Sequence, residues 1–166
     1  MLRSVNGSSP IVHPSAHIAP DATLVGAVFL EENSSVWYHA TLRADHDSIR
    51  VGRCSNLQDN CVVHVDCGQP CIIGAEVTVG HGAILHSCTI EDGCTIGMGS
   101  IILNGAVVGE GSIVGAGALI TKNTVIPPRS LVVGSPAQVK RQVSDQELEH
   151  SRRAAQEYVK AAAEQL

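Results

Sequence analysis

Aliphatic residues recur every six positions along most of this sequence, and no other feature constrains the fold as strongly. The positions fall into four runs: Val12, Ile18, Leu24, Leu30, Val36, Leu42; Val51, Leu57, Val63; Ile73, Val79, Leu85; and Ile90, Ile96, Ile102, Val108, Val114, Ile120, Ile126, Val132. Small residues favour the place four positions later, as at Ala22, Ala40 and Ala106. A six-residue period of this kind is typical of a parallel β-helix, in which each hexad forms one short strand and a turn.

The repeat therefore predicts an all-β solenoid with a β-helix domain over residues 11-137. Three hexads close a triangular coil of about eighteen residues, and coils stack about 4.8 Å apart, the spacing of paired strands. The twenty hexads make about six to seven coils. A prism of this width is too narrow for aromatic rings, which explains an aromatic content of only 2%.

The end of the chain predicts a helix over residues 144-166. Ser144 and Glu147 form the S-x-x-E pattern of a capping box. Leu148 and Ala155 begin an apolar stripe at helical spacing. We expect this helix to pack on the same domain, where it covers one face or an open end of the prism.

Charge and composition exclude several classes of protein. A net charge of −5 without a Lys/Arg cluster argues against nucleic-acid binding, and no apolar run reaches membrane-spanning length. The start, MLRSVNGSSP, lacks the hydrophobic segment of a signal peptide, so we expect a cytoplasmic protein. Its six cysteines are then mainly reduced thiols, although Cys67 and Cys71 flank a short loop and could form a disulfide or bind a metal.

The period breaks at two places that bear on function. The spacing is nine from Leu42 to Val51 and ten from Val63 to Ile73, so three and four residues are extra. We expect these residues to bulge at corners of the prism and to leave the columns of aliphatic residues aligned.

With the columns aligned, Arg43, His64 and His86 stack along one edge of the prism, about 4.8 Å apart. His81 falls in a neighbouring column, under Asp59. The nearly extended chain from His81 to His86 spans more than about 10 Å, whereas zinc ligands lie about 2.0–2.1 Å from the ion. If the three histidines bind one ion, His81 must come from a neighbouring subunit, as a cyclic trimer allows.

The segments around these residues resemble the gamma-class carbonic anhydrase family. They read VWYHATLRAD, NLQDNCVVH, GHGAILHSC, IGMGS and VVGSPA, in family order from about residue 11 to the helix. The resemblance implies a left-handed β-helix and a homotrimer. It also implies that His64, His81 and His86 hold Zn²⁺, or alternatively Fe²⁺ or Co²⁺, at the subunit interface.

The resemblance implies a lyase in which metal-bound hydroxide attacks CO₂ to give bicarbonate, reversibly. Gln58 matches the glutamine that hydrogen-bonds the metal-bound solvent, and Asp59 matches the adjacent carboxylate. Arg43 and Asp45 match a pair that bridges subunits and lines the pocket. The resemblance also places Tyr158 of the helix near that pocket.

The sequence departs from the family where protons are transferred. The loop after the first histidine ligand is only DCGQP and has no glutamate, and His46 stands where the family has a second catalytic glutamate. His46 is a possible proton shuttle, because an unperturbed imidazole titrates near pH 6.5. These departures leave open whether hydration is fast.

Two other functions remain open at this point. A hexapeptide acyltransferase or acyl-CoA thioesterase would use one histidine as a general base, but the long substrate-enclosing loop of such acyltransferases is missing. A non-catalytic scaffold stabilised by metal is the other alternative. Outside the predicted site, we expect ordinary surface histidines at His13, His17, His39 and His150, and a turn residue at Asn104.

Overall fold

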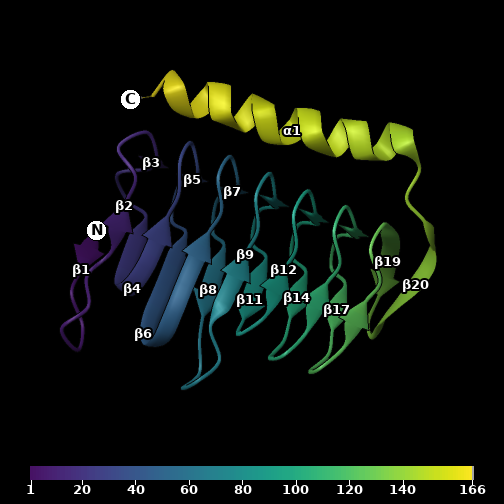
Figure 1. The fold of residues 1–166 in the computed structure, drawn as a ribbon, viewed down its shortest axis with the longest axis horizontal. Helices are drawn as coiled ribbons and strands as arrows, with labels where there is room; N and C mark the ends of the chain where they lie inside the picture. Colours follow the sequence, from purple (N-terminus) through teal and green to yellow (C-terminus); the bar gives the residue numbers. More distant parts are fainter. Residues whose placement is uncertain (166) are drawn as a thin grey trace.

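The computed structural model describes residues 1–165, which form a solenoid of about seven coils with one helix beside it (Figure 1). One eight-stranded sheet contains β3 (His17–Ile18), β5 (Ser35–Val36), β7 (Asn56–Leu57), β10 (Thr78–Val79), β13 (Thr95–Ile96), β16 (Ile113–Val114), β19 (Ser130–Gly134) and β20 (Ala137–Gln142). The other sheet has twelve strands: β1 (Leu2–Arg3), β2 (Ile11–Val12), β4 (Thr23–Leu30), β6 (Thr41–Val51), β8 (Val62–His64), β9 (Cys71–Ile73), β11 (Ile84–His86), β12 (Thr89–Ile90), β14 (Ile101–Ile102), β15 (Val107–Val108), β17 (Leu119–Ile120) and β18 (Val125–Ile126). The prediction of a left-handed parallel β-helix with a C-terminal helix is confirmed.

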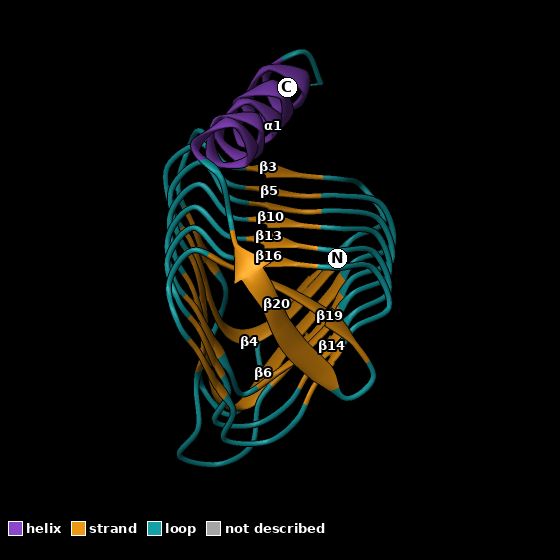
Figure 2. Cartoon of the chain, turned by 90° about the vertical axis from the view of Figure 1, so that its right-hand side faces the viewer, coloured by secondary structure: helices purple, strands orange, loops and turns teal. Residues whose placement is uncertain are grey.

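The six-residue period forms the core. Seen end-on, the coils outline a triangle whose sides are the strands (Figure 2). The repeating aliphatic residue points inward, so Leu42, Val63 and Leu85 are fully buried. The same three residues are partners in neighbouring parallel strands, which confirms that the columns stay aligned across the breaks in the period.

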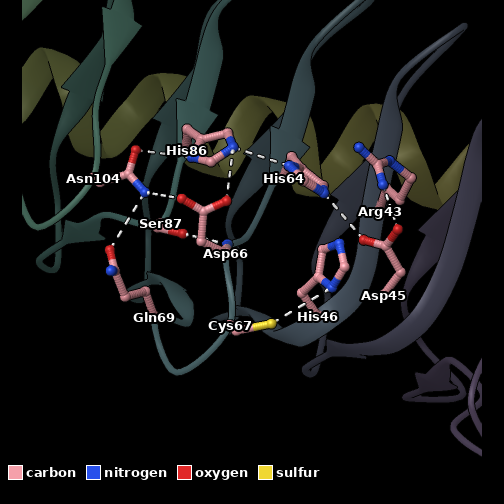
Figure 3. Close-up of polar contacts among 10 residues, drawn as sticks. All are labelled: Arg43, Asp45, His46, His64, Asp66, Cys67, Gln69, His86, Ser87 and Asn104. Carbon is pink, nitrogen blue, oxygen red and sulfur yellow. Dashed lines mark hydrogen bonds and ion pairs between the residues drawn. The ribbon is translucent and has the colours of Figure 1, made fainter.

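The two breaks take different forms. The three extra residues before Val51 form a bulge inside one continuous strand, β6, rather than a separate loop, because the register with β4 shifts between Ala44 and Ile49. The residues after Val63 form a projecting loop that a bridge between Asp66 and Gln69 closes. Both features project from the prism beside the same edge (Figure 3).

The sheets extend beyond residues 11-137 at both ends. At the start, β1 pairs with β4 in parallel, and at the other end β20 folds back antiparallel on β19. Neither segment has the hexad pattern, so the repeat does not reveal them. Both pair with the backbone groups that a terminal strand would otherwise leave exposed.

Helix α1 (Asp145–Ala163) begins at Ser144 and runs back along the coils against one corner of the prism (Figures 1 and 2). The Ser144 hydroxyl accepts the Glu147 N–H, and the Glu147 carboxylate accepts the Ser144 N–H, so the capping box is formed. The helix contacts β5, β7 and β10. The predicted end at residue 166 lies outside the described residues. Within residues 1–165, no helix has the length and apolar character needed to cross a bilayer.

Candidate metal centre

Two histidines face each other on the outer surface of neighbouring coils. His64 ends β8 and His86 ends β11, and the two are register partners (Figure 3). Each follows a buried aliphatic residue, and because side chains alternate along a strand, each imidazole points outward. The Nδ1 atom of His64 lies 2.9 Å from the Nε2 atom of His86.

A side-chain oxygen holds the other nitrogen of each ring. The Nε2 atom of His64 lies 3.0 Å from Oδ1 of Asp45, and the Nδ1 atom of His86 lies 3.0 Å from Oδ1 of Asn104. A neutral imidazole carries one N–H and one lone pair, so donation to these oxygens turns both lone pairs toward each other. An ion between the facing nitrogens would satisfy both, and in a tetrahedral zinc site such nitrogens lie about 3.3 Å apart. The pair therefore fits a metal ion.

The Asp66–Gln69 loop completes the surroundings of His86. Oδ1 of Asp66 lies 4.0 Å from Nε2 of His86. Within residues 1–165, His64, Asp66 and His86 form one of two groups whose potential ligand atoms all lie within 4.8 Å of one another. The Asn104 amide donates to Asp66 Oδ2 at 2.7 Å and to Gln69 Oε1 at 3.3 Å. The Asp66 N–H donates to the Ser87 hydroxyl at 2.8 Å. These bonds fix the loop against the ring of His86.

Asp45 lies on the bulge of β6, where it contacts both Arg43 and His64. Burial acts to raise the pKa of the Asp45 carboxyl, but hydrogen bonds from Arg43 and His64 outweigh burial and lower that pKa below its ordinary value. Asp45 is therefore ionised at neutral pH and can accept the N–H of His64. Arg43 lies beside this centre and does not contact either histidine's facing nitrogen.

His46 lies next to the centre, on the solvent side of the same bulge. Its ring meets that of His64 edge-on, with centroids 6.0 Å apart, and its Nδ1 atom lies 3.7 Å from Sγ of Cys67. Asp45, His46 and His64 are the second group with ligand atoms within 4.8 Å. His46 is thus exposed and next to His64, and its role as a proton shuttle stays a prediction.

The sequence left open whether Cys67 and Cys71 form a disulfide or bind a metal, and the structure has both as free thiols. Cys67 is exposed and faces His46, whereas Cys71 is buried and its sulfur lies 3.9 Å from that of Cys88. Cys71 occupies an inward position of β9, so the loop sends the two thiols to opposite sides of the wall. All six cysteines are free.

His81 lies away from the other two histidines within the chain. Its Nδ1 atom is 3.0 Å from Oδ2 of Asp59, and its side chain is 46% exposed. The His81 N–H donates to Oε1 of Gln58 at 3.2 Å, and the Gln58 amide in turn donates to Asn56 at 3.3 Å. Gln58 is only 7% exposed, so it is fixed beneath His81. As in His64 and His86, a side-chain oxygen contacts one ring nitrogen of His81, here Nδ1, and the other nitrogen, Nε2, is left to ligate an ion.

Sequence reasoning missed the residues that orient His86. Asn104 is a turn residue that also bonds the His86 ring, and Asp66 and Gln69 fix it from the loop. The spacing from His86 to Asn104, one coil of eighteen residues, was the available signal.

The expectation that His17 is a surface residue is wrong. It is 4% exposed, its Nε2 has no hydrogen-bond partner, and burial lowers its pKa. Its ring lies 5.4 Å from that of Trp37, which in turn contacts Tyr158 of α1. The hexad pattern carries no information about which corner the helix covers.

Known proteins resemble this chain in sequence and in fold. The sequence model described as bacterial transferase hexapeptide (six repeats) matches residues 87–122. The chain is 49% identical to a protein named probable carbonic anhydrase from Methanocaldococcus jannaschii, over 90% of this chain and 94% of that one. It is 40% identical to gamma carbonic anhydrase 2, mitochondrial, of Arabidopsis thaliana, over 97% of this chain and 60% of that longer protein. A crystal structure of a hexapeptide transferase family protein from Anaplasma phagocytophilum superposes with a TM-score of 0.97 at 38% identity, and the match covers 100% of this chain and 98% of that one.

Proposed function

Because this chain belongs to the gamma-class carbonic anhydrase family of hexapeptide-repeat proteins, we propose that it catalyses the metal-dependent, reversible hydration of CO₂ to bicarbonate. One observation carries the proposal: Nδ1 of His64 and Nε2 of His86 face each other 2.9 Å apart, while oxygens of Asp45 and Asn104 lie 3.0 Å from the other nitrogen of each ring. Histidines that ligate a metal have outer partners of this kind.

The ion in this proposal is Zn²⁺, with Fe²⁺ or Co²⁺ as alternatives, because imidazole suits all three. His64 and His86 of one subunit would hold it together with His81 of the next subunit in a homotrimer. A divalent ion bound there supplies a Lewis acid that lowers the pKa of bound water to about 7. Three protein ligands leave a position open for water or substrate. The separation of His81 from the other two rings within one chain supports the shared arrangement.

The surrounding residues have distinct roles in this proposal. Asp45, Asn104 and Asp59 orient the three imidazoles, and Gln58 fixes the backbone of His81 from the buried side. Arg43 holds Asp45 and adds a half-exposed positive charge that favours the bicarbonate anion. His46, at the solvent edge, would carry the proton released on hydration to bulk water.

The first test combines metal content with stopped-flow CO₂ hydration on zinc-loaded and anaerobic iron-loaded protein. We expect one ion per chain, and His81→Ala should lose both the ion and the hydration activity. His150→Ala changes an exposed histidine of α1 and is the matched control, which should behave as the parent. Ion binding without hydration in either form would reject the proposed reaction.

A mixing experiment tests whether two subunits share the site. His64→Ala and His81→Ala trimers would each lack a ligand at every interface, but random mixed trimers restore complete sites where an intact His81 meets an intact His64. Ion content and hydration should recover to about a quarter of the parent value. If refolded mixtures recover nothing, the shared arrangement is wrong.

The second candidate is acyl transfer from an acyl-CoA, which the match to transferase hexapeptides favours. Such chemistry needs a histidine whose unprotonated nitrogen is free to reach the substrate, whereas the facing nitrogens of His64 and His86 lie only 2.9 Å from each other. Release of thiol from acetyl-CoA, with amine acceptors present or absent, distinguishes this activity from hydration. A scaffold would show neither activity.

We place the protein in the cytoplasm, which its six free cysteines support.

A further inference from the structure

Two of the six free thiols lie against each other inside the prism. Cys71 begins β9 and Cys88 comes just before β12, and their sulfur atoms are 3.9 Å apart. The next residue of each, Ile72 and Thr89, are register partners, and the Ile72 N–H donates to the Cys88 carbonyl at 2.9 Å. The backbones of the two cysteines are therefore one strand spacing apart, about 4.8 Å. A disulfide joins residues whose Cα atoms lie about 4.4–6.8 Å apart, so this pair is at a bonding separation.

Both cysteine side chains point into the core. Side chains alternate along a strand, so Cys71 and Cys88 face inward as Ile73 and Ile90 do two residues later. Cys71 is fully buried and Cys88 is 2% exposed. A neighbouring subunit would pack on the outer surface of the coils, so assembly leaves this contact as it is.

The other two buried cysteines have different partners. The Cys61 thiol donates to the Gly80 carbonyl at 3.2 Å, and the Cys94 thiol donates to the Gly109 carbonyl at 3.2 Å. In the pair, the hydrogen bond with Cys88 outweighs burial and lowers the pKa of the Cys71 thiol. Because the thiolate is the form that reacts with an oxidant, Cys71 is the member that reacts first.

A bond between the two sulfurs would close one whole coil into a covalent ring. From Cys71 to Cys88 the chain passes through β9, β10 and β11 and returns to the neighbour of its first strand. The imidazoles of His81 and His86 belong to this coil, but His86 ends β11 on the outer surface while the sulfurs lie inside. The ring would therefore hold the coil without using any group of the metal centre.

We propose that Cys71 and Cys88 form a reversible disulfide when the protein meets a hydroperoxide, and that this bond locks the coil that carries His81 and His86. The Cys71 thiolate attacks a peroxide oxygen and becomes a sulfenic acid, while the alkoxide or hydroxide released takes up the proton that Cys71 lost. The Cys88 sulfur then attacks the sulfenic sulfur, the S–S bond forms, and hydroxide leaves as water with the Cys88 proton. The two thiols lose two electrons, and the hydroperoxide gains them.

Burial determines which oxidant can act and how fast. A small oxidant reaches these sulfurs only when the wall of the solenoid opens transiently, so the pair should react more slowly than exposed Cys67. In a reducing compartment such a disulfide forms under oxidation and is reversed afterwards by small thiols. The proposal goes beyond the metal chemistry and does not depend on it.

Hydrogen peroxide is the probe, applied to the folded, metal-free protein. The double replacement Cys54→Ser and Cys67→Ser leaves only the four buried thiols, so exposed sulfurs cannot form other products. Thiols are then counted with Ellman's reagent in denaturant, and unreduced peptides are mapped by mass spectrometry. We expect loss of two thiols, a peptide that joins Cys71 to Cys88, and full recovery of the thiols with dithiothreitol. Closure of a ring of one coil should raise the melting temperature by about 5–10 °C.

Single replacements in the same background identify the pair. Cys71→Ala and Cys88→Ala should each keep all their remaining thiols after peroxide and show no rise in melting temperature. Cys94→Ala is the matched control, because Cys94 is equally buried but bonds a carbonyl, and it should still lose two thiols. The mapped peptide decides the question even if an alanine variant does not fold. His64→Ala should form the disulfide as the parent does.

Three results would overturn the proposal. The first is that all four buried thiols survive peroxide exposure long enough to oxidise Cys67 completely in the parent protein. The second is a disulfide that joins a different pair. The third is a Cys71–Cys88 disulfide that leaves the melting temperature unchanged. A reduced protein that binds no ion would instead reject the proposed hydration, and these thiol measurements would stand.

Discussion

Each histidine of the candidate centre has one ring nitrogen bonded to a side-chain oxygen. Asp45 serves His64, Asn104 serves His86, and Asp59 serves His81. The partner fixes the tautomer and the direction of the remaining lone pair before any ion arrives. The rings are thus oriented for ligation by residues one coil away or on a bulge.

Replacing Asp45 tests this orientation. Asp45→Ala removes the acceptor of the His64 N–H, so the affinity for zinc should fall about 10- to 100-fold. Competition with a chromophoric chelator measures the affinity. Asp47→Ala is the matched control, because Asp47 lies on the same bulge but bonds only the neighbouring Ser48. Equal affinities for the two variants would show that Asp45 does not orient His64.

The cysteines should differ sharply in reactivity, since the thiolate is the reactive form. Burial raises the pKa of Cys61 to about 11 and that of Cys94 to about 12, and Cys71 and Cys88 are also buried. With Ellman's reagent at pH 8, exposed Cys67 should react first and half-buried Cys54 more slowly. The other four should react only in denaturant, and Cys67→Ser should remove the fast phase. Rapid modification of more than two thiols in folded protein would contradict the burial described.

At residue level, the sequence predicts the positions that the period fixes and little else. His64 and His86 could be placed because each directly follows a buried aliphatic residue, so their direction follows from strand alternation. Asp66 and Cys67 lie in a loop, where the direction of a side chain depends on dihedral angles that no pattern reports. For this reason the sequence could not decide whether Cys67 and Cys71 pair.

At the scale of the elements, the bulge of β6 carries Asp45 and His46, so the packing of this bulge should affect the centre. Gly26 of β4 lies opposite, with a φ of +76°, and a Cβ there would lie 2.2 Å from the carbonyl oxygen of Ala44. Gly26→Ala should lower the free energy of unfolding by more than about 3 kcal/mol, from positive-φ strain plus the clash. It should also weaken zinc binding, because Ala44 precedes Asp45.

Gly68→Ala is the control for backbone strain alone. Gly68 has a φ of +70° but nothing within 4 Å of an added Cβ, so its replacement should lower the free energy of unfolding by only about 1 kcal/mol. Urea denaturation measures both variants. If Gly26→Ala and Gly68→Ala lower the free energy of unfolding equally, then β4 can shift away from Ala44, and close contact with Gly26 does not fix the bulge.

The cap of α1 should respond to acid. Hydrogen bonds from Arg141 and then from Ser144 lower the pKa of Glu147 well below its usual range. Because the pKa of Glu147 is lower in the folded protein than in the unfolded chain, where it is about 4.3, its ionised form stabilises the folded state above that pH. This stabilisation is lost as the pH falls from about 4.3 toward the folded-state pKa. The protection of the first-turn amides of α1 against hydrogen exchange, relative to the intrinsic rate at each pH, should therefore fall below about pH 4. Glu147→Gln should remove this pH dependence, and Glu149→Gln, on the exposed face, should keep it.

The elements themselves were largely predictable, and their continuity was not. Each hexad strand and the helix start at Ser144 follow from local patterns. Strand β6 continues across a corner, and β20 folds back on β19. Both features depend on backbone pairing with neighbouring strands, which the six-residue repeat does not predict.

For the whole molecule, removal of metal should destabilise the assembly. Since only the folded trimer would present complete sites, zinc at 100 times its dissociation constant stabilises by about 2.7 kcal/mol per site. A chelator should lower the melting temperature of the parent and of His150→Ala. It should have no effect on His81→Ala, which lacks the shared ligand. An unchanged parent melting temperature would argue against a shared site.

The path of α1 has a consequence for how the molecule comes apart. In a stack where each coil touches only its neighbours, unfolding can fray from either end, one turn after another. Here the last residues of the chain return to the early coils, where the Tyr38 hydroxyl bonds Gln165 and Trp37 packs on Tyr158. The helix therefore links the last coil to coils near the start of the solenoid, which do not touch it directly. We therefore expect the coils that carry β5, β7 and β10 to unfold together with α1 rather than before it.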